Sequence, residues 1–144
     1  MPDKVNPIPE GFHTITPRMF VRGAAEAIEF YQRAFGATEL GRFADPNGKI
    51  VNAAIKLGDS IISLAEESPE WGNYSPPSLG GATMILTLNV EDADAVWEQA
   101  IAAGAKEIFP LQDQFYGYRQ GRVEDPFGHL WIISTQIEGA APEG

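Results

Sequence analysis

Cysteine is absent from the 144 residues of this chain. Its absence excludes disulfides, thiolate nucleophiles and zinc sites with sulfur ligands. Basic residues are few: ten Lys and Arg stand against twenty Asp and Glu, so the formal net charge is −10 at pH 7. Nucleic acids and anionic membranes are bound by clustered Lys and Arg, and we therefore expect neither partner.

Long apolar runs are also missing. No stretch comes near the roughly 20 residues that a membrane-spanning helix needs, and the first residues, Met1 to Lys4, do not resemble the start of a signal peptide. We therefore expect a cytoplasmic location. Apolar residues still make up 44% of the chain, which is enough to build a packed core in one domain over residues 1–144.

The first half of the chain combines one helical period with several strand-like runs. Apolar residues recur at helical spacing over residues 23–35, and Gly36 is typical of a helix end. Pro17 restricts the strand before this helix to a sheet edge or a strand start. The pattern predicts a β-α-β-β-β unit, with strands at residues 14–21, 38–44, 49–57 and 60–65.

A segment rich in Pro, Gly and Ser separates this unit from a second one. The second unit has a predicted helix at residues 92–103 and predicted strands at residues 82–90, 106–109, 117–123 and 129–135. We therefore divide the domain into a first βαβββ module at residues 12–66, a linker at residues 67–81, a second module at residues 82–137 and a tail at residues 138–144.

The two halves match where each helix ends. Residues 35–40 (FGATEL) align with residues 103–108 (AGAKEI). Duplication of one unit explains this match, although similar amphipathic helices could also arise independently. Two such units placed side by side enclose a concavity between them, and ligand sites favour seams of this kind.

Several sequence blocks are similar to those of one known family. They are residues 8–14 (IPEGFHT), 27–31 with 35–37, 58–60, and 113–117 continued by 125–129 (DPFGH). In order and spacing, the chain resembles the vicinal oxygen chelate superfamily of glyoxalases, bleomycin-resistance proteins and extradiol dioxygenases, specifically its PhnB-like branch. The resemblance implies an α+β fold of two paired βαβββ modules that form a half-barrel cleft, often in a homodimer.

Enzymes of this superfamily hold one divalent metal ion in the cleft through His, Glu or Gln, whereas other members carry no metal and bind drugs. The positions that match the family's metal ligands hold Thr16, Ser63, Ile85 and Ile132 in this chain. Hydroxyl and aliphatic side chains are poor ligands for a catalytic divalent ion. We therefore expect neither a metal nor another cofactor.

Other candidate ligands do not replace the missing ones. His13 lies three residues before Thr16, so a straight strand places it on the opposite face. His129 lies in a Pro-Phe-Gly-His turn, where a hydrogen bond to the backbone is the expected role. Glu66 and Glu67, beside the linker, are expected to be solvated.

One segment of the second module, residues 115–119 (FYGYR), combines aromatic rings with a guanidinium group. Tyrosine offers an apolar face with a polar tip, and Arg119 can bind a carboxylate or stack on a ring. The segment therefore suits a planar or anionic small molecule. In the alternative interpretation Phe115 and Tyr116 fill the core and Arg119 pairs with Glu124 or Asp125.

These observations predict a metal-free member of the family that binds a small hydrophobic or aromatic molecule in the inter-module cleft. The alternative is an enzyme of the same fold, a lyase, isomerase or dioxygenase with or without a metal. No catalytic residue is predicted, because no serine elbow or tuned acid–base pair is present. The predicted ligand-binding residues are Asn52, Ser63, Phe115, Tyr116, Tyr118, Arg119 and Trp131.

Overall fold

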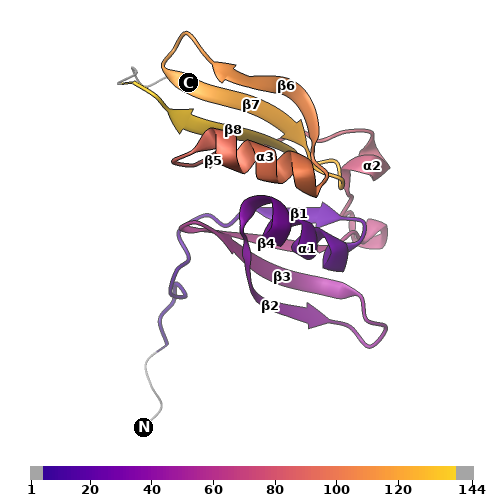
Figure 1. Ribbon diagram of the computed structural model, residues 1–144. Coiled ribbons are helices and arrows are strands. Elements are labelled where there is room, and N and C mark those ends of the chain that lie inside the picture. Colours follow the sequence, from indigo (N-terminus) through magenta and orange to yellow (C-terminus); the bar gives the residue numbers. More distant parts are fainter. Residues whose placement is uncertain (1–4, 139–144) are drawn as a thin grey trace.

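The computed structural model describes residues 5–138, in which two modules each combine a four-stranded sheet with one long helix (Figure 1). Module 1 consists of β1 (Arg18–Val21), α1 (Ala24–Phe35), β2 (Thr38–Ala44), β3 (Ile50–Leu57) and β4 (Ser60–Glu66). Module 2 consists of β5 (Ile85–Asn89), α3 (Ala93–Ala103), β6 (Lys106–Asp113), β7 (Tyr118–Glu124) and β8 (Leu130–Gln136). Between the modules lie the 3-10 helix η1 (Pro69–Trp71) and the short helix α2 (Pro76–Leu79).

The two sheets have the same topology. The strand order is β1-β4-β3-β2 in module 1 and β5-β8-β7-β6 in module 2. In each sheet the first strand runs parallel to the last, and the other neighbours are antiparallel. The sheets are open and do not close into a barrel. The predicted α+β fold of two βαβββ modules is therefore confirmed.

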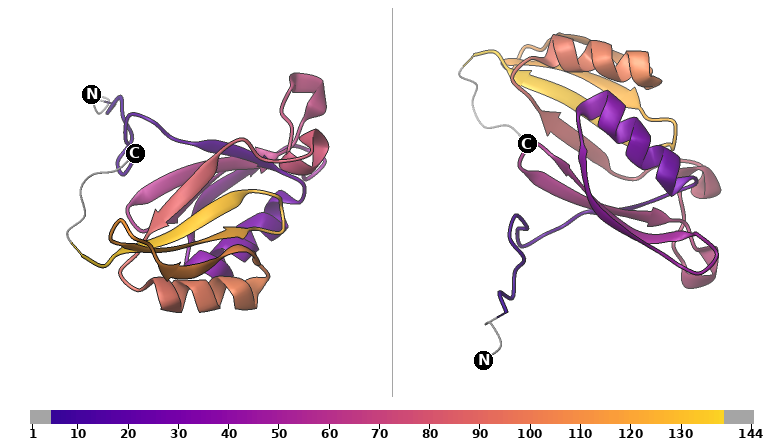
Figure 2. Two further views of the ribbon diagram at one scale, coloured as in Figure 1. Left: turned by 90° about the horizontal axis from the view of Figure 1, so that it is seen from above. Right: turned by 60° about the horizontal axis from the view of Figure 1, so that its bottom comes forward.

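Helices α1 and α3 lie next to each other on one side of the two sheets (Figures 1 and 2). They are linked by Gln99 of α3, whose side-chain nitrogen donates to the backbone oxygen of Arg33 at 2.7 Å. Within residues 5–138, no helix covers the other face of either sheet, and we call it the open face.

Side chains alternate between the helix-covered face and the open face. The helix-covered faces bury apolar residues such as Ile55 and Leu64 in module 1 and Val123 and Ile133 in module 2. Strand register places the following residues on the open faces: Arg18, Ala54 and Ser63 in module 1, and Tyr118, Gln120, Arg122, Ile132 and Ser134 in module 2.

Strand β1 is shorter than predicted. It begins at Arg18 and not at Thr14, directly after Pro17. Proline has no backbone N–H to donate to a neighbouring strand, so regular pairing starts only after it. The Pro17 carbonyl oxygen still accepts a hydrogen bond from the Ser63 N–H at 2.9 Å.

An aromatic cluster joins the two modules. The rings of Tyr31 and Phe35 on α1 lie 5.5 Å and 4.7 Å, between centroids, from the indole of Trp131 on β8. Trp131 is only 1% exposed. The helix of module 1 therefore packs against the strand of module 2, and the two modules share one hydrophobic core.

No helix within residues 5–138 combines the length and apolar character needed to cross a membrane.

Candidate ligand-binding site

A cavity of about 520 Å³ lies between the modules. Its walls come from the segment before β1, the turn between β3 and β4, the C-terminal end of α1 and the length of β5. Phe35 and Trp131 line it together with aliphatic side chains such as Leu57 and Leu86. Apolar side chains make up the larger part of the walls, and polar groups come from the segment before β1, from the β3–β4 turn and from β5; they are His13, Thr16, Asp59, Ser60, Thr87 and Asn89.

The four positions that match the family's metal ligands lie in four different segments of the two modules. Thr16 precedes β1, Ser63 lies within β4, and Ile85 and Ile132 lie on β5 and β8. Within residues 5–138, no three His, Cys, Asp or Glu side chains lie close enough together to hold a metal ion. Two hydroxyls and two aliphatic side chains do not fit a divalent ion.

A positive charge stands beside one of these positions. The Nη1 atom of Arg18 donates to Asn52 Oδ1 at 2.8 Å and to Ser63 Oγ at 3.1 Å. Ser63 Oγ donates to the same Asn52 oxygen at 2.9 Å, and Arg18 Nη2 donates to the Val51 carbonyl oxygen at 3.0 Å. A guanidinium group here would repel a bound cation, which is a second reason why a metal does not fit.

The predicted residues Asn52 and Ser63 are thus brought together on the open face of module 1 by Arg18, which the sequence reasoning missed. The sequence does contain the information needed to predict it, because Arg18 lies two residues after Thr16 and every second side chain of a strand points to the same face. Asn52 lies on β3, which is an internal strand of the sheet.

Arg119 lies on the helix-covered face and not on the open face. Its guanidinium donates to both carboxylate oxygens of Asp94 on α3, at 2.9 and 3.0 Å, and to Asp113 Oδ1 at 3.0 Å. These hydrogen bonds raise the pKa of Arg119 and lower the pKa of Asp94. The alternative interpretation, in which Arg119 pairs with Glu124 or Asp125, is therefore wrong, because its partners are Asp94 and Asp113.

The aromatic residues of the same segment differ in how far they are exposed to solvent. Phe115 is 97% exposed at the turn between β6 and β7, so it does not fill the core. The Tyr116 hydroxyl donates to Gln120 Oε1 at 2.7 Å, and Gln120 Nε2 donates to Ser134 Oγ at 2.9 Å. Tyr118 is half-buried on the open face beside Tyr116, with ring centroids 6.0 Å apart.

Trp131 lies on the helix-covered face, where it lines the inter-module cavity. Its indole Nε1 donates to Asp125 Oδ2 at 2.9 Å, and the Tyr31 hydroxyl donates to the same oxygen at 2.5 Å. Burial raises the pKa of Tyr31 well above its usual value, and the negative charge of Asp125 adds to the effect. Asp125 is 2% exposed and holds the two modules together through these bonds.

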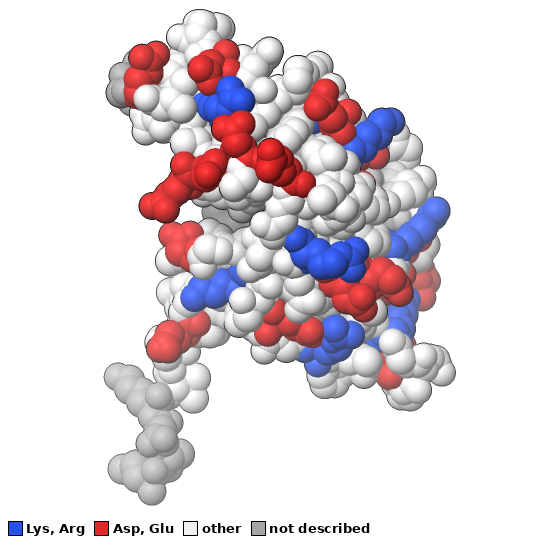
Figure 3. All heavy atoms as spheres, in the orientation of Figure 1, with Lys and Arg blue, Asp and Glu red and all other residues white. Residues whose placement is uncertain are grey.

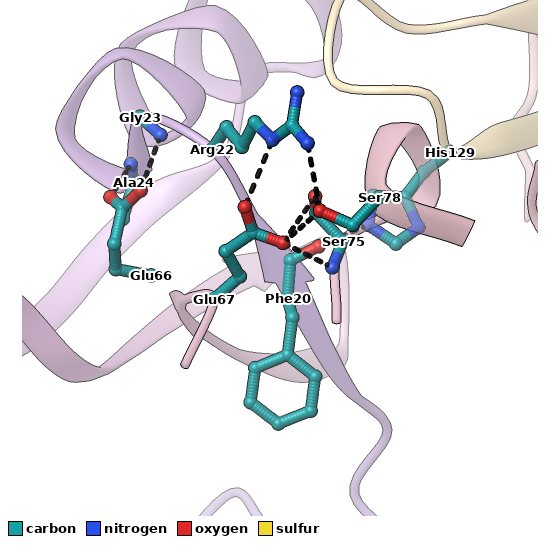
Figure 4. Close-up of polar contacts among 9 residues, drawn as sticks. All are labelled: Phe20, Arg22, Gly23, Ala24, Glu66, Glu67, Ser75, Ser78 and His129. Atoms are coloured by element: carbon teal, nitrogen blue, oxygen red, sulfur yellow. Dashed lines mark hydrogen bonds and ion pairs between the residues drawn. The ribbon is translucent and has the colours of Figure 1, made fainter. Parts of the chain in front are cut away.

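Two carboxylates at the end of β4, Glu66 and Glu67, are not simply solvated as predicted (Figure 4). Glu66 accepts from the N–H groups of Gly23 and Ala24 at the start of α1. Glu67 anchors the linker, because it accepts from the N–H and the hydroxyl of Ser75, which precedes α2, and from the hydroxyl of Ser78 within α2. Glu67 also pairs with the Arg22 guanidinium.

These hydrogen bonds, with that from Ser78 the largest influence, lower the pKa of Glu67 to about 2. His129 contributes to the same region, because its Nε2 lies 2.9 Å from the Phe20 carbonyl oxygen of β1 (Figure 4). The prediction of a backbone hydrogen bond for His129 is therefore confirmed, and this bond connects module 2 to module 1.

Comparison with known proteins agrees with this architecture. Residues 11–133 match the family described as the Glyoxalase/Bleomycin resistance protein/Dioxygenase superfamily. An uncharacterized protein from Mycobacterium bovis is 39% identical over 126 residues, which cover 85% of this chain and 83% of that protein. The chain therefore belongs to the glyoxalase/bleomycin-resistance/dioxygenase superfamily.

Solved structures share the fold. TioX from Micromonospora sp. ML1 is 28% identical, with a TM-score of 0.66, and the match covers 92% of this chain and all (100%) of TioX. A PhnB protein from Bacillus cereus has a TM-score of 0.67 over 85% of this chain and 99% of its own. Because that protein is only 18% identical, it shows the fold alone, and membership of the PhnB-like branch stays a prediction.

Proposed function

We propose that this protein binds a small hydrophobic or aromatic molecule in the cavity between its modules, without a metal ion. The observation that carries this proposal is the cavity itself, which has a volume of about 520 Å³ and is lined by Phe35 and Trp131. Cavities of this size with mostly apolar walls and a few polar groups are typical of small-molecule sites. The chemistry of the four metal positions supports the metal-free part.

A neutral fluorescent dye, Nile red, tests binding in the cavity. Ser60 lies in the cavity wall near solvent, so Ser60→Trp is expected to block part of the cavity and to weaken dye binding at least tenfold. Thr38→Trp adds the same side chain at an exposed position outside the cavity and is the matched control. Equal dye binding by both variants and the wild type would place the dye elsewhere and contradict the proposal.

Metal analysis tests the second part of the proposal. Protein dialysed against chelator and then exposed to zinc, nickel or manganese is expected to retain less than one equivalent after desalting. Stable uptake of one equivalent would show that residues other than Thr16, Ser63, Ile85 and Ile132 supply a metal site.

We also propose that the protein forms a homodimer, belongs to the PhnB-like branch and is located in the cytoplasm, as we expect from the sequence. Exposed apolar side chains on the outer strand of module 1, Leu40 and Phe43 on β2, support self-association. Sedimentation velocity over a range of concentrations is expected to show a species of twice the chain mass. A single species of the chain mass at all concentrations would rule out the dimer.

A further inference from the structure

The open face of module 2 carries an arginine that sequence reasoning missed. Arg122 on β7 lies opposite Ile132 in the strand register, and Arg18 on β1 lies opposite Ser63 in module 1. Ser63 and Ile132 are the two positions on the last strands that match metal ligands in the family. Each of these two positions therefore has a guanidinium group from a neighbouring strand beside it, which places a positive charge on the open face of each module.

The two arginines differ from Arg22, Arg42 and Arg119 in their partners. Within residues 5–138, the ion pairs of the protein use Arg22, Arg42 and Arg119, and none involves Arg18 or Arg122. Acidic side chains gather instead over the helix-covered side of module 2 (Figure 3). In a chain with a formal net charge of −10, an arginine without a carboxylate partner on the open face is an unusual local feature.

Arg122 has the greater unmet hydrogen-bonding capacity. Arg18 donates to three neutral oxygens on β3 and β4. In contrast, the buried Nε atom of Arg122 has no hydrogen-bond partner among the described residues. A buried polar donor without a partner costs free energy, and such groups are rare in native proteins unless a bound molecule or water satisfies them.

The surroundings of Arg122 define what it could bind. Arg122 lines a hollow of about 290 Å³ on the open face, outside the inter-module cavity. Its guanidinium carbon lies 5.1 Å from the ring centroid of Phe109, which is 56% exposed. The remaining wall consists of Pro110, Gly121, Ile132 and the polar side chains of Gln112, Gln114, Tyr116 and Gln120. Among residues 5–138, no carboxylate lines this hollow.

We infer that this hollow binds a planar aromatic carboxylic acid, with the carboxylate on the Arg122 guanidinium and the ring system against Phe109. A carboxylate accepts two parallel hydrogen bonds from a guanidinium group, and within residues 5–138 no ion pair engages that of Arg122. The amides of the wall can donate to the remaining lone pairs of the acid. This site is separate from the inter-module cavity, so it stands or falls independently of the proposed function.

Calorimetric titration of the whole protein with 2-naphthoate tests this inference. The uncharged 2-naphthamide has the same rings, and we expect it to bind at least about tenfold more weakly, since hydrogen bonds to charged groups are the stronger ones. Inorganic phosphate, which has the charge without the rings, is also expected to bind more weakly. Equal affinity for the acid and the amide, equal affinity for phosphate, or no binding of the acid would each overturn the inference.

Variants locate the site. Arg122→Gln is expected to reduce the affinity for 2-naphthoate at least about tenfold, and Arg122→Lys, which keeps the charge but loses the planar fork, is expected to give a smaller loss. Arg33→Gln makes the same change of charge at an exposed position of α1 and should leave the affinity unchanged. Unchanged affinity in Arg122→Gln would overturn the assignment.

A wild-type measurement covers the case in which Arg122 variants do not fold. In amide NMR spectra of the wild-type protein, 2-naphthoate is expected to shift the resonances of Gln120 and Ile132, which line the hollow, and not those of Leu88 and Asn89, which line the inter-module cavity. The reverse pattern would overturn the inference and would place the acid in the cavity.

Discussion

Module 1 joins β2 to β3 through Asp45-Pro46-Asn47-Gly48, and module 2 joins β7 to β8 through Asp125-Pro126-Phe127-Gly128. Each aspartate closes its turn in the same way, because its Oδ1 atom accepts from the backbone N–H groups two and four residues later at 2.9–3.0 Å. Both turns end in a glycine with positive φ, 84° for Gly48 and 91° for Gly128.

The second carboxylate oxygen distinguishes the two turns. Asp125 Oδ2 accepts from the Tyr31 hydroxyl and the Trp131 indole inside the shared core, whereas Asp45 has no side-chain partner of this kind among the described residues. The comparison teaches that one local motif serves two purposes. It closes a hairpin near the surface in module 1, and in module 2 it also connects the modules.

The largest effect is expected from removing the carboxylate that connects the modules. Asp125→Ala removes the carboxylate partner of the buried Tyr31 hydroxyl, the Trp131 N–H and two backbone donors, and should lower the free energy of unfolding by about 3 kcal/mol or more. Asp45→Ala is the matched control and should cost only about 1 kcal/mol, because water can reach its donors. Urea unfolding followed by circular dichroism measures both, and equal losses would contradict the distinction.

Glycines in the two sheets offer a second comparison. A Cβ atom added at Gly121 on β7 would lie 2.5 Å from the Trp97 ring and 2.8 Å from the Leu111 backbone. Gly121→Ala should therefore destabilise the protein by about 1–3 kcal/mol through overpacking. At Gly41 on β2 an added Cβ meets nothing within 4 Å, so Gly41→Ala should be close to neutral. Thermal unfolding compares the two, and a loss in Gly41→Ala as large as in Gly121→Ala would show that crowding is not the cause.

Alkaline unfolding probes the contact between the modules. The pKa of Tyr31 is raised in the folded state, so above pH ~10, where a tyrosine of the unfolded chain ionises, the folded state binds more protons. The contribution of Tyr31 to stability is present below that pH and is lost as the pH rises further. Between about pH 9 and about pH 11, the free energy of unfolding of Tyr31→Phe should fall less steeply than that of the wild type. Tyr74→Phe, at an exposed tyrosine of the linker, is the control.

The smallest effect is expected at the linker. The pKa of Glu67 is lowered from 4.5 to about 2, so its contribution to stability is complete above pH 4.5 and is lost as the pH falls towards 2. Glu67→Gln should remove part of the acid-induced loss of stability that the wild type shows over this range. Because the Ser78 hydroxyl, the largest cause of the lowered pKa, and the Arg22 guanidinium are both exposed, solvent screening should keep the effect at neutral pH to about 1 kcal/mol. An unchanged acid profile in urea titrations between pH 2 and pH 5 (about these limits) would show that these hydrogen bonds do not persist in solution.

Much of the fold follows from local patterns. Helix α1 was predicted from apolar spacing and ends at Gly36, which adopts the left-handed conformation. The turn at Asp45 was predicted from the Asn-Gly pair, and β2 has the predicted limits, Thr38–Ala44. Strand β6 extends further than predicted, to Asp113. The prediction was too short because Pro110 and the polar residues after it obscure the strand pattern, and proline is tolerated here because β6 is an edge strand.

The candidate site was less predictable. Arg119 and Arg122 are three residues apart on β7, so the alternation of a strand requires them to point to opposite faces. The arginine that points towards α3 is Arg119, because it pairs with Asp94 on that helix. This contact joins residues 25 positions apart in the chain. The sequence motif drew attention to Arg119 because of its tyrosine neighbours, whereas the arginine with the unpaired donor is Arg122.

The sequence by itself determined the family, the two βαβββ units, the turns and the chemical identity of the four residues at the metal positions. These properties depend on neighbouring residues or on side-chain type alone. Only the tertiary structure decided that Asp125 connects the modules, that Glu67 holds the linker, and that Arg18 and Arg122 lie on the open faces beside Ser63 and Ile132. The physical reason is that hydrogen-bond partners and burial are set by segments distant in the chain, and a single sequence contains no record of which segments meet.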